Sequence, residues 1–293
     1  MSCHICPRHC ADRSTGVCGV GNKLLVARIA KHQWEEPVIS GTNGSGTVFF
    51  SGCSLRCVFC QNHTISQELV GKEISPRELD EHIIRLIEQG VHNLNFVTPT
   101  HYALFLADFL QTHHYPVPIV YNSSGYEEPE VLEALRDKVQ IFLPDLKYSD
   151  SALAKRFSAA PDYVEKAAAA IQKMVELVGD VQYDENGLLQ KGVLVRHLML
   201  PGYLENTLGV IDLFDTLKGS NQMLFSLMSQ YTPMGRIEDF PCLQRRLRQE
   251  EYERALNYVQ LLGIDGFCQS PDSAQEIYVP PFSAHLECGE ESI

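Results

Sequence analysis

Residues 47–62 read TVFFSGCSLRCVFCQN, a strand-like run followed by a cysteine-bearing loop. The run Thr47–Ser51 is rich in β-branched and aromatic residues, which is typical of a buried strand. Cys53, Cys57 and Cys60 follow at the spacing C-x3-C-x2-C, so one short loop can wrap three thiolates around a metal centre. Thiolates suit iron–sulfur clusters and zinc. Three of them leave one position of a four-iron cluster open, as a catalytic metal requires.

Beyond this loop, short β-rich runs alternate with helical segments. A helix is predicted to start after Ser75, because Pro76 follows and Glu78 completes a capping box. Helices are expected at 75–90, 102–113, 130–138, 162–178, 205–217 and 250–262, and further strands at 93–98, 118–122, 139–143, 193–200 and 223–231. About six β–α units in this order predict an α/β fold, a partial (β/α)6 TIM-type barrel with its chemistry at the carboxyl ends of the strands.

Three segments are expected along the chain. Residues 1–45 form a cysteine-rich N-terminal extension, 46–265 the partial barrel, and 266–293 a C-terminal tail with little periodicity. The net charge is −13, yet residues 1–33 carry five basic side chains against the single acid Asp12. The acidic remainder makes nucleic acid an unexpected partner.

The ten cysteines of the chain are concentrated near its start. No apolar run is long enough for a signal peptide or a membrane span, so we expect a cytoplasmic protein that does not contact a membrane. Thiols stay reduced in the cytoplasm, which favours metal ligation over disulfides. For the central loop, two alternatives are a zinc site completed by His63 and cysteines without metal. Cys242, Cys268 and Cys288 are isolated and are expected to be ordinary thiols.

A second group of cysteines, with His4 and His9 among them, lies close to the N-terminus. Its members, at the spacing C-x2-C-x3-C-x7-C, are Cys3, Cys6, Cys10 and Cys18. Four thiols this close could hold zinc or an auxiliary iron–sulfur cluster, and the alternative is a reduced tail without metal. Ligand type alone does not separate the two metals.

Several strings occur in a recognisable order, namely SGCSLRCVFCQN, NFVTPTHY, YNSSGY, FLPDLKYSD, VRHLMLPG and SQYTP. With its C-x3-C-x2-C loop after a strand, the chain resembles radical S-adenosylmethionine (SAM) enzymes, in the branch similar to pyruvate formate-lyase activating enzymes. The resemblance implies that Cys53, Cys57 and Cys60 hold a [4Fe–4S] cluster whose open iron binds SAM. One-electron reduction would then yield methionine and a 5′-deoxyadenosyl radical that abstracts hydrogen from a substrate.

The same resemblance implies which residues bind the cofactor. Asp145 and Lys147, in Asp-Leu-Lys, match a motif that contacts SAM, and Arg196 could grip its carboxylate. Asn122 and Ser123 match an Asp-Thr pair near a cation site, although Asn replaces Asp here. The alternatives are a surface ion pair for Asp145 and Lys147, a structural salt bridge for Arg196, and a simple turn for Asn122 and Ser123.

One motif of the family is missing after the second predicted strand. Radical SAM enzymes usually have Gly-Gly-Glu there to receive the amino group of SAM, whereas this chain has Thr98-Pro99-Thr100-His101. Thr98 or Thr100 could supply acceptors, and His101 could face the cavity. The alternative is that Thr100 caps the following helix.

The resemblance leaves the substrate open. The leading hypothesis is a hydrogen-abstracting enzyme with an unknown substrate, such as a protein glycine in a glycyl-radical enzyme. The alternatives are radical modification of a peptide or RNA, and a non-catalytic metal-binding interaction protein. No G-x-G-x-x-G motif follows a strand, so an external electron donor such as flavodoxin or ferredoxin is expected.

Overall fold

The computed structural model describes residues 2–269 and 282, and the strands there form a single open sheet. The strands are β1 (Leu25–His32), β2 (Ser45–Phe50), β3 (Lys72–Glu73), β4 (Leu94–Val97), β5 (Ile119–Ser123), β6 (Ile141–Pro144), β7 (Gln182–Tyr183), β8 (Leu189–Leu198), β9 (Leu224–Met228) and β10 (Gly266–Cys268). Their order is β10-β9-β8-β6-β5-β4-β2-β1-β3, with β7 paired to β8. Along this order, neighbours from β2 to β10 are parallel. Strand β1 is antiparallel to both β2 and β3, and β7 is antiparallel to β8.

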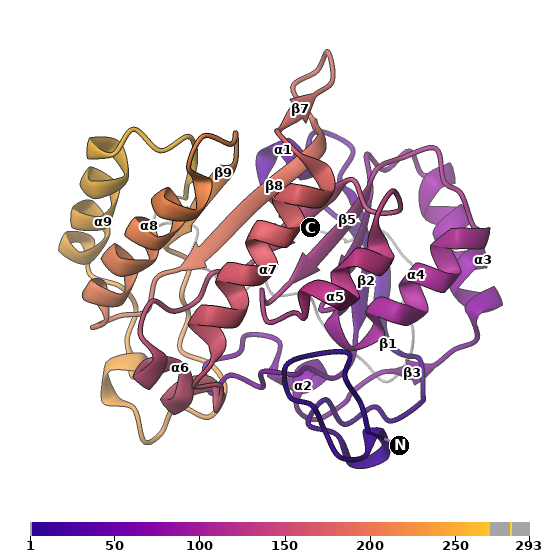
Figure 1. Cartoon of the computed structure of the whole chain (residues 1–293), viewed down its shortest axis with the longest axis horizontal. Coiled ribbons are helices and arrows are strands. Elements are labelled where there is room, and N and C mark those ends of the chain that lie inside the picture. The colour runs from indigo at the N-terminus through magenta and orange to yellow at the C-terminus, as the bar shows by residue number, and fades with distance from the viewer. Residues whose placement is uncertain (1, 270–281, 283–293) are drawn as a thin grey trace.

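Helices connect the parallel strands and cover the outside of the sheet (Figure 1). They are α1 (Pro37–Ser40), α2 (His63–Ser66), α3 (Pro76–Glu88), α4 (Ala103–Thr112), α5 (Pro129–Leu132), α6 (Ser151–Ser158), α7 (Tyr163–Val178), α8 (Leu204–Lys218) and α9 (Gln249–Leu261). Short 3-10 turns lie at Arg13–Thr15, Thr100–Tyr102, Glu133–Leu135 and Pro241–Gln244. The described chain therefore contains six successive β–α units, and the predicted partial barrel is confirmed.

Local sequence signals explain how the helices are placed. Ser75 caps α3 through a capping box with Glu78, as predicted, and the helix buries Leu79, Ile83 and Leu86 against the sheet. The predicted helix 130–138 is shorter than expected, because α5 gives way to a 3-10 turn and Asp137 adopts a positive φ of 61°. Helix α6, which was not predicted, is capped by the Asp150 side chain.

Strand β1 was also not predicted. It extends the sheet beyond β2 with the register Ala30 to Thr47, and most of its residues are buried, so no in–out alternation marks it. The division into 1–45, 46–265 and 266–293 stays a prediction, although β1 lies in the same sheet as the barrel strands. Most of the predicted tail, including Cys288, lies outside the described residues.

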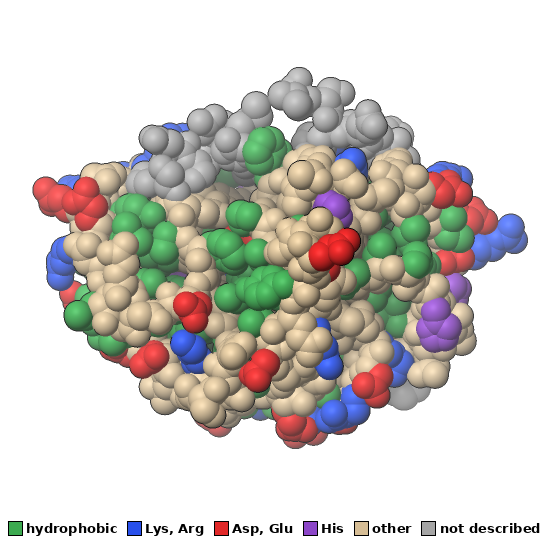
Figure 2. Space-filling model, turned by 90° about the horizontal axis from the view of Figure 1, so that it is seen from above, with side chains coloured by type: hydrophobic (Ala, Val, Ile, Leu, Met, Phe, Trp, Pro, Cys, Tyr) green, Lys and Arg blue, Asp and Glu red, His purple; other side chains and the backbone are tan. Residues whose placement is uncertain are grey.

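Two observations bear on partners. Among the described residues, no helix combines the length and the apolar character needed to cross a membrane. On the face shown in Figure 2, Lys and Arg side chains are scattered among Asp and Glu and form no broad basic surface. That face therefore lacks the electrostatic footprint of a nucleic-acid binder.

Candidate functional site

The cysteine loop lies at the carboxyl end of β2 and lines a cleft of about 240 Å³. Cys53, Cys57 and Cys60 all line this cleft, as the sequence predicts for a common ligand set. Gly52 starts the loop with a φ of 86°, and a Cβ there would lie 2.5 Å from the carbonyl oxygen of Cys18. Glycine is thus required by both the backbone conformation and the close approach of the N-terminal segment.

Hydrogen-bond donors point at all three sulfurs of this loop. The Leu55 amide donates to Cys53 Sγ (3.4 Å), the Ser158 hydroxyl to Cys57 Sγ (2.9 Å) and the Ser66 hydroxyl to Cys60 Sγ (3.3 Å). Such donors stabilise negative charge on metal-bound thiolates. The residues present therefore fit an anionic iron–sulfur group.

The protonation of these cysteines is set mainly by burial. Burial, with the neighbouring Cys57 as a smaller cause, raises the pKa of Cys60 to about 12 and also raises the pKa of Cys53. Without a cation, both groups are neutral thiols at pH 7. Binding of a metal centre must therefore release protons.

A charged network of Asp145, Lys147 and Arg196 faces the cysteines across the same cleft. Lys147 Nζ donates to Asp145 Oδ2 (2.5 Å), and Arg196 Nε donates to Asp145 Oδ1 (3.1 Å). Burial favours the neutral form of Asp145, but the charges of Lys147 and Arg196 outweigh it and lower the pKa of this carboxyl. All three groups are ionised at neutral pH, so the cleft offers both cations and an anion to a zwitterionic ligand.

Glu35 joins this network and was missed by the sequence reasoning. It accepts hydrogen bonds from Arg196 NH1 (3.2 Å), Asn122 Nδ2 (3.1 Å) and Asn95 Nδ2 (3.0 Å). His32, at the end of β1, pairs with Ser45 at the start of β2. The segment after β1 therefore crosses the amino-terminal ends of the strands, and Glu35 enters the barrel from the end opposite the cysteine loop.

Neighbours of Glu35 also differ from expectation. Trp34, for which no role beyond packing or exposure was predicted, lines the cleft and is 52% exposed. Glu36 accepts a hydrogen bond from the Ser226 hydroxyl (2.7 Å), and burial raises the pKa of its carboxyl. The paired acids Glu35-Glu36 before a proline could have drawn attention to this segment. No local sequence pattern, however, connects them to their hydrogen-bond partners, which lie 60 to 190 residues later in the chain.

The Asn122 and Ser123 pair lies in the cleft at the end of β5. Asn122 Oδ1 accepts from Arg196 NH2 (2.6 Å), and Ser123 Oγ accepts from the Gly125 amide (3.2 Å). Gly125 has a φ of 75°, and a Cβ there would lie 2.3 Å from the Asp145 carbonyl oxygen. Asn122 and Ser123 can therefore both begin a turn and line the cleft.

In the segment Thr98-Pro99-Thr100-His101, some side chains line the cleft and others do not. Thr98 lines the cleft, has a positive φ of 59°, and donates its amide to the Asn122 carbonyl (2.9 Å). A β-branched residue in this conformation is strained, which marks a constrained backbone beside the cleft. Thr100 is instead buried with its hydroxyl donating to Glu127 Oε1 (2.6 Å), and it makes no cap on the following helix. Its predicted alternatives, cofactor acceptor and helix cap, both lack support.

Glu127 is a buried carboxyl close to this segment. It also accepts a hydrogen bond from the Tyr121 hydroxyl (3.2 Å). Burial raises the pKa of Glu127 to about 7, although hydrogen bonds from Thr100, Ser123 and Tyr121 act in the other direction.

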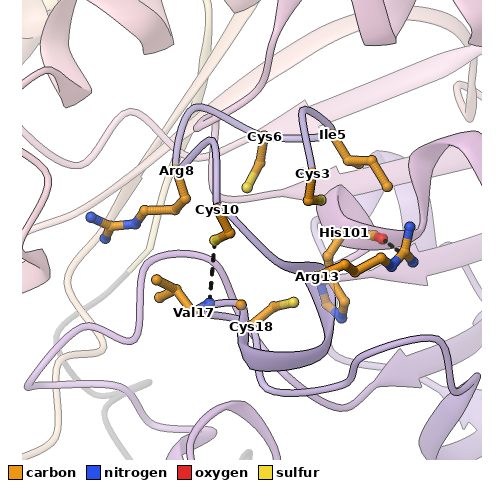
Figure 3. Close-up of a pocket in the computed structure, with 10 residues that line it drawn as sticks. Cys3, Ile5, Cys6, Arg8, Cys10, Arg13, Val17, Cys18 and His101 are labelled. Atoms are coloured by element: carbon orange, nitrogen blue, oxygen red, sulfur yellow. Dashed lines mark hydrogen bonds between the residues drawn. The ribbon is translucent and has the colours of Figure 1, made fainter. Parts of the chain in front are cut away.

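The N-terminal cysteines lie around a separate, smaller cavity together with His101 (Figure 3). His101 therefore does not face the main cleft, contrary to the expectation that it could serve the cofactor there. Its Nε2 donates to the Ser51 carbonyl (2.9 Å), and burial lowers the pKa of the ring to about 4. Cys242 and Cys268 are exposed, in keeping with ordinary thiols.

The family model described as the radical SAM superfamily matches residues 47–213. "Uncharacterized protein MJ0674" of Methanocaldococcus jannaschii is 29% identical over 277 residues, which cover 90% of this chain and 76% of that protein. "Uncharacterized protein MJ0808" of the same organism is 30% identical over 155 residues, 46% of each chain.

Two solved structures share the fold. Methylornithine synthase (PylB) superposes with a TM-score of 0.50 at 13% identity, covering 82% of this chain and 75% of that one. Streptococcus suis SuiB bound to precursor peptide SuiA gives a TM-score of 0.50 at 10% identity, with 74% of this chain covered but only 46% of the SuiB chain. These likenesses concern the fold alone. The family model spans more than half of the chain, from β2 through most of α8, and the chain belongs to the radical SAM superfamily.

Proposed function

We propose that this protein is an enzyme that binds a [4Fe–4S] cluster at Cys53, Cys57 and Cys60 and cleaves SAM reductively in the adjoining cleft. The observation that carries the proposal is the convergence of these cysteines with Asp145, Lys147 and Arg196 in one cleft. The bound cluster would supply the electron for cleavage of the sulfonium. The side chains that line the cleft would bind and orient SAM and exclude water from it.

The charged side chains suit the amino acid end of SAM. Lys147 and Arg196 are cations for its carboxylate, and Asp145 is an acceptor for its ammonium or ribose hydroxyls. In the structure, Lys147 and Arg196 each donate to Asp145. When SAM binds, some of the hydrogen bonds to Asp145 would be replaced by hydrogen bonds to SAM. Glu35 would still hold Arg196 through its own hydrogen bond, from the end of the barrel opposite the cysteine loop.

The structural support for Thr98 is its position in the cleft beside Asn122. We propose that acceptors of Thr98, in this strained bend, take the place of the missing Gly-Gly-Glu run. Thr100 is left out of the cofactor site, because its hydroxyl donates to Glu127.

The reaction proposed is hydrogen abstraction from a substrate, with a glycine of a partner protein as the leading candidate. Modification of a peptide or RNA is the second candidate, and the scattered charges of the face in Figure 2 favour the protein. The electron donor would be an external flavodoxin or ferredoxin. The non-catalytic alternative needs a fourth protein ligand in the cleft, and His63 is not among its described lining residues.

The experiment is a titration of the anaerobically reconstituted, reduced protein with SAM, followed by electron paramagnetic resonance. Binding of SAM to an open iron should shift the signal of the cluster in the cleft, and Cys57→Ala should abolish this SAM-dependent shift. Cys242→Ala is the matched control, since this thiol is exposed and outside the cleft. A fully loaded cluster with no response to SAM would establish the non-catalytic alternative.

Substrate identity can be sought with the same preparation. A substrate carrying deuterium at the abstracted position should transfer it to 5′-deoxyadenosine. A labelled glycyl protein that transfers deuterium supports the activase, whereas transfer only from a peptide or RNA supports the second candidate.

A further inference from the structure

Four thiols gather near the N-terminus without a helix or strand to place them. Cys3, Cys6, Cys10 and Cys18 all line one small cavity. Figure 3 shows their side chains arranged around this space. Between residues 2 and 24 the only regular element described is the 3-10 turn Arg13–Thr15. A segment with so little regular structure can gain further order from a bound ligand, and the four cysteines are free thiols.

The backbone around these sulfurs is arranged as it is in the central loop. The Arg8 amide donates to Cys6, the Val20 amide to Cys18, and the Val17 amide to Cys10 Sγ at 3.5 Å. In the first two cases the donor lies two residues after the cysteine, which is the relation between Leu55 and Cys53 in the central loop. Amides aimed at sulfur stabilise metal-bound thiolates.

Cations and one unpartnered imidazole nitrogen complete the lining of this cavity. Arg8 Nε donates to the Ser54 carbonyl (2.7 Å) and Arg13 Nε to the Gly21 carbonyl (2.8 Å). In these contacts neither guanidinium is paired with a carboxylate. His101 is only 3% exposed, and its Nδ1 has no hydrogen-bond partner. The two guanidinium groups suit an anionic group bound in the cavity, because four thiolates around a metal carry net negative charge. The neutral His101 ring donates through Nε2, so its Nδ1 is an acceptor and adds nothing to anion binding.

The spacing of the thiols separates two kinds of metal site. A single zinc ion holds four sulfurs about 2.3 Å from itself and therefore in mutual contact. Within the described residues, no three ligand-type side chains converge on the position of one ion, and this also holds for Cys53, Cys57 and Cys60. Thiols that each bind a different iron do not need to converge on one point, and these four line one cavity without such convergence among the described residues.

We propose that Cys3, Cys6, Cys10 and Cys18 bind a second iron–sulfur cluster, a [4Fe–4S] cluster with four protein ligands. Every iron then has a thiolate, so this cluster has no open position for SAM. The site is separate from the proposed catalytic cluster, and the inference does not depend on SAM cleavage.

The second cluster would also brace the central cysteine loop. Arg8 donates to the Ser54 carbonyl at 2.7 Å, and Arg56 NH1 donates to the Val17 carbonyl at 3.2 Å. With the close approach of Cys18 to Gly52, these contacts join both cysteine segments. A cluster that fixes the conformation of residues 3–18 would therefore also restrict the conformation of the loop that carries Cys53.

The test is metal analysis of the full chain after anaerobic reconstitution with iron and sulfide. The wild type should hold about eight irons and eight sulfides, from two four-iron clusters. A variant with Cys53, Cys57 and Cys60 replaced by Ala should keep about four of each, and its reduced signal should not respond to SAM. One zinc per chain in this variant, or no metal at all, would overturn the proposal.

A second variant guards against misfolding of the first. Cys6→Ser with Cys10→Ser leaves the central loop intact and should hold about four irons, with a signal that shifts on addition of SAM. Its thermal unfolding midpoint should be lower than that of the wild type, because the brace is lost. Eight irons retained in this variant would contradict the ligand assignment, and Cys242→Ala should match the wild type in every measurement.

Discussion

Arg196 is the residue at which the cleft network can be tested most sharply. Its guanidinium donates to Asp145, Glu35 and Asn122, from strands and loops on both sides of the barrel. Arg196→Lys keeps the charge but has one ammonium in place of the planar fork, so at least two of these contacts are lost. At roughly 1.5–3 kcal/mol for each charge-assisted hydrogen bond, the free energy of unfolding should fall by about 3 kcal/mol or more.

The assay is equilibrium urea unfolding of the metal-free chain under reducing conditions. Arg254→Lys is the matched control, since Arg254 and Glu205 form an exposed pair at 3.9 Å, with side chains 65% and 86% exposed. That substitution should cost less than about 0.5 kcal/mol. In the reconstituted protein, Arg196→Lys should also weaken SAM binding by about tenfold or more through loss of the bidentate grip. A variant within about 1 kcal/mol of the wild type, with unchanged SAM affinity, would refute the reasoning for this network.

Three further predictions concern single groups around the cleft. Because the pKa of Glu127 is about 7 in the folded chain against 4.5 as the ordinary value, its contribution to stability is full below about pH 4.5 and is lost as the pH rises to about 7. Glu127→Gln should therefore reduce the loss of unfolding free energy between pH 5 and pH 8 by about 2.5 kcal/mol, and identical pH profiles for the two proteins would contradict this. Ser158→Ala removes the donor to Cys57 Sγ and should make the cluster's reduction potential more negative by about 20–60 mV, whereas exposed Ser220→Ala should leave it unchanged in a redox titration. Gly125→Ala places a Cβ 2.3 Å from the Asp145 carbonyl and should lower the free energy of unfolding by about 1–3 kcal/mol and weaken SAM binding, and wild-type values for both would exclude a tight approach there.

Much of the fold follows from local sequence patterns. Three features depend only on residues close together in sequence: the capping box at Ser75 and Glu78, the apolar face of α3 and the β–α alternation. Each is present in the structure. Strand β1 escaped prediction because both of its faces are covered, which removes the alternation by which a strand is usually recognised. Its antiparallel pairing with β2 and β3 also departs from the β–α alternation of the other strands.

The cleft was partly predictable, and the reason is topological. Asp145 directly follows β6, and Arg196 lies near the end of the neighbouring parallel strand β8, so strand order alone brings them together with the loop after β2. Glu35 arrives from the opposite end of the barrel along an unpredicted strand, and no spacing rule connects it to Arg196. Likewise, the 3-10 turn after Pro99 sends Thr100 to Glu127 and His101 to the N-terminal cavity, an outcome that depends on side chains distant in sequence.

The central claim is that this chain cleaves SAM with a cluster held by Cys53, Cys57 and Cys60. The most direct measurement is the formation of 5′-deoxyadenosine and methionine when the reconstituted protein is mixed anaerobically with dithionite and SAM. Both products should appear in equal amounts with the wild type and with Cys242→Ala, and neither should appear with Cys57→Ala. Absence of 5′-deoxyadenosine from a wild-type preparation with a fully loaded, reducible cluster would contradict the claim.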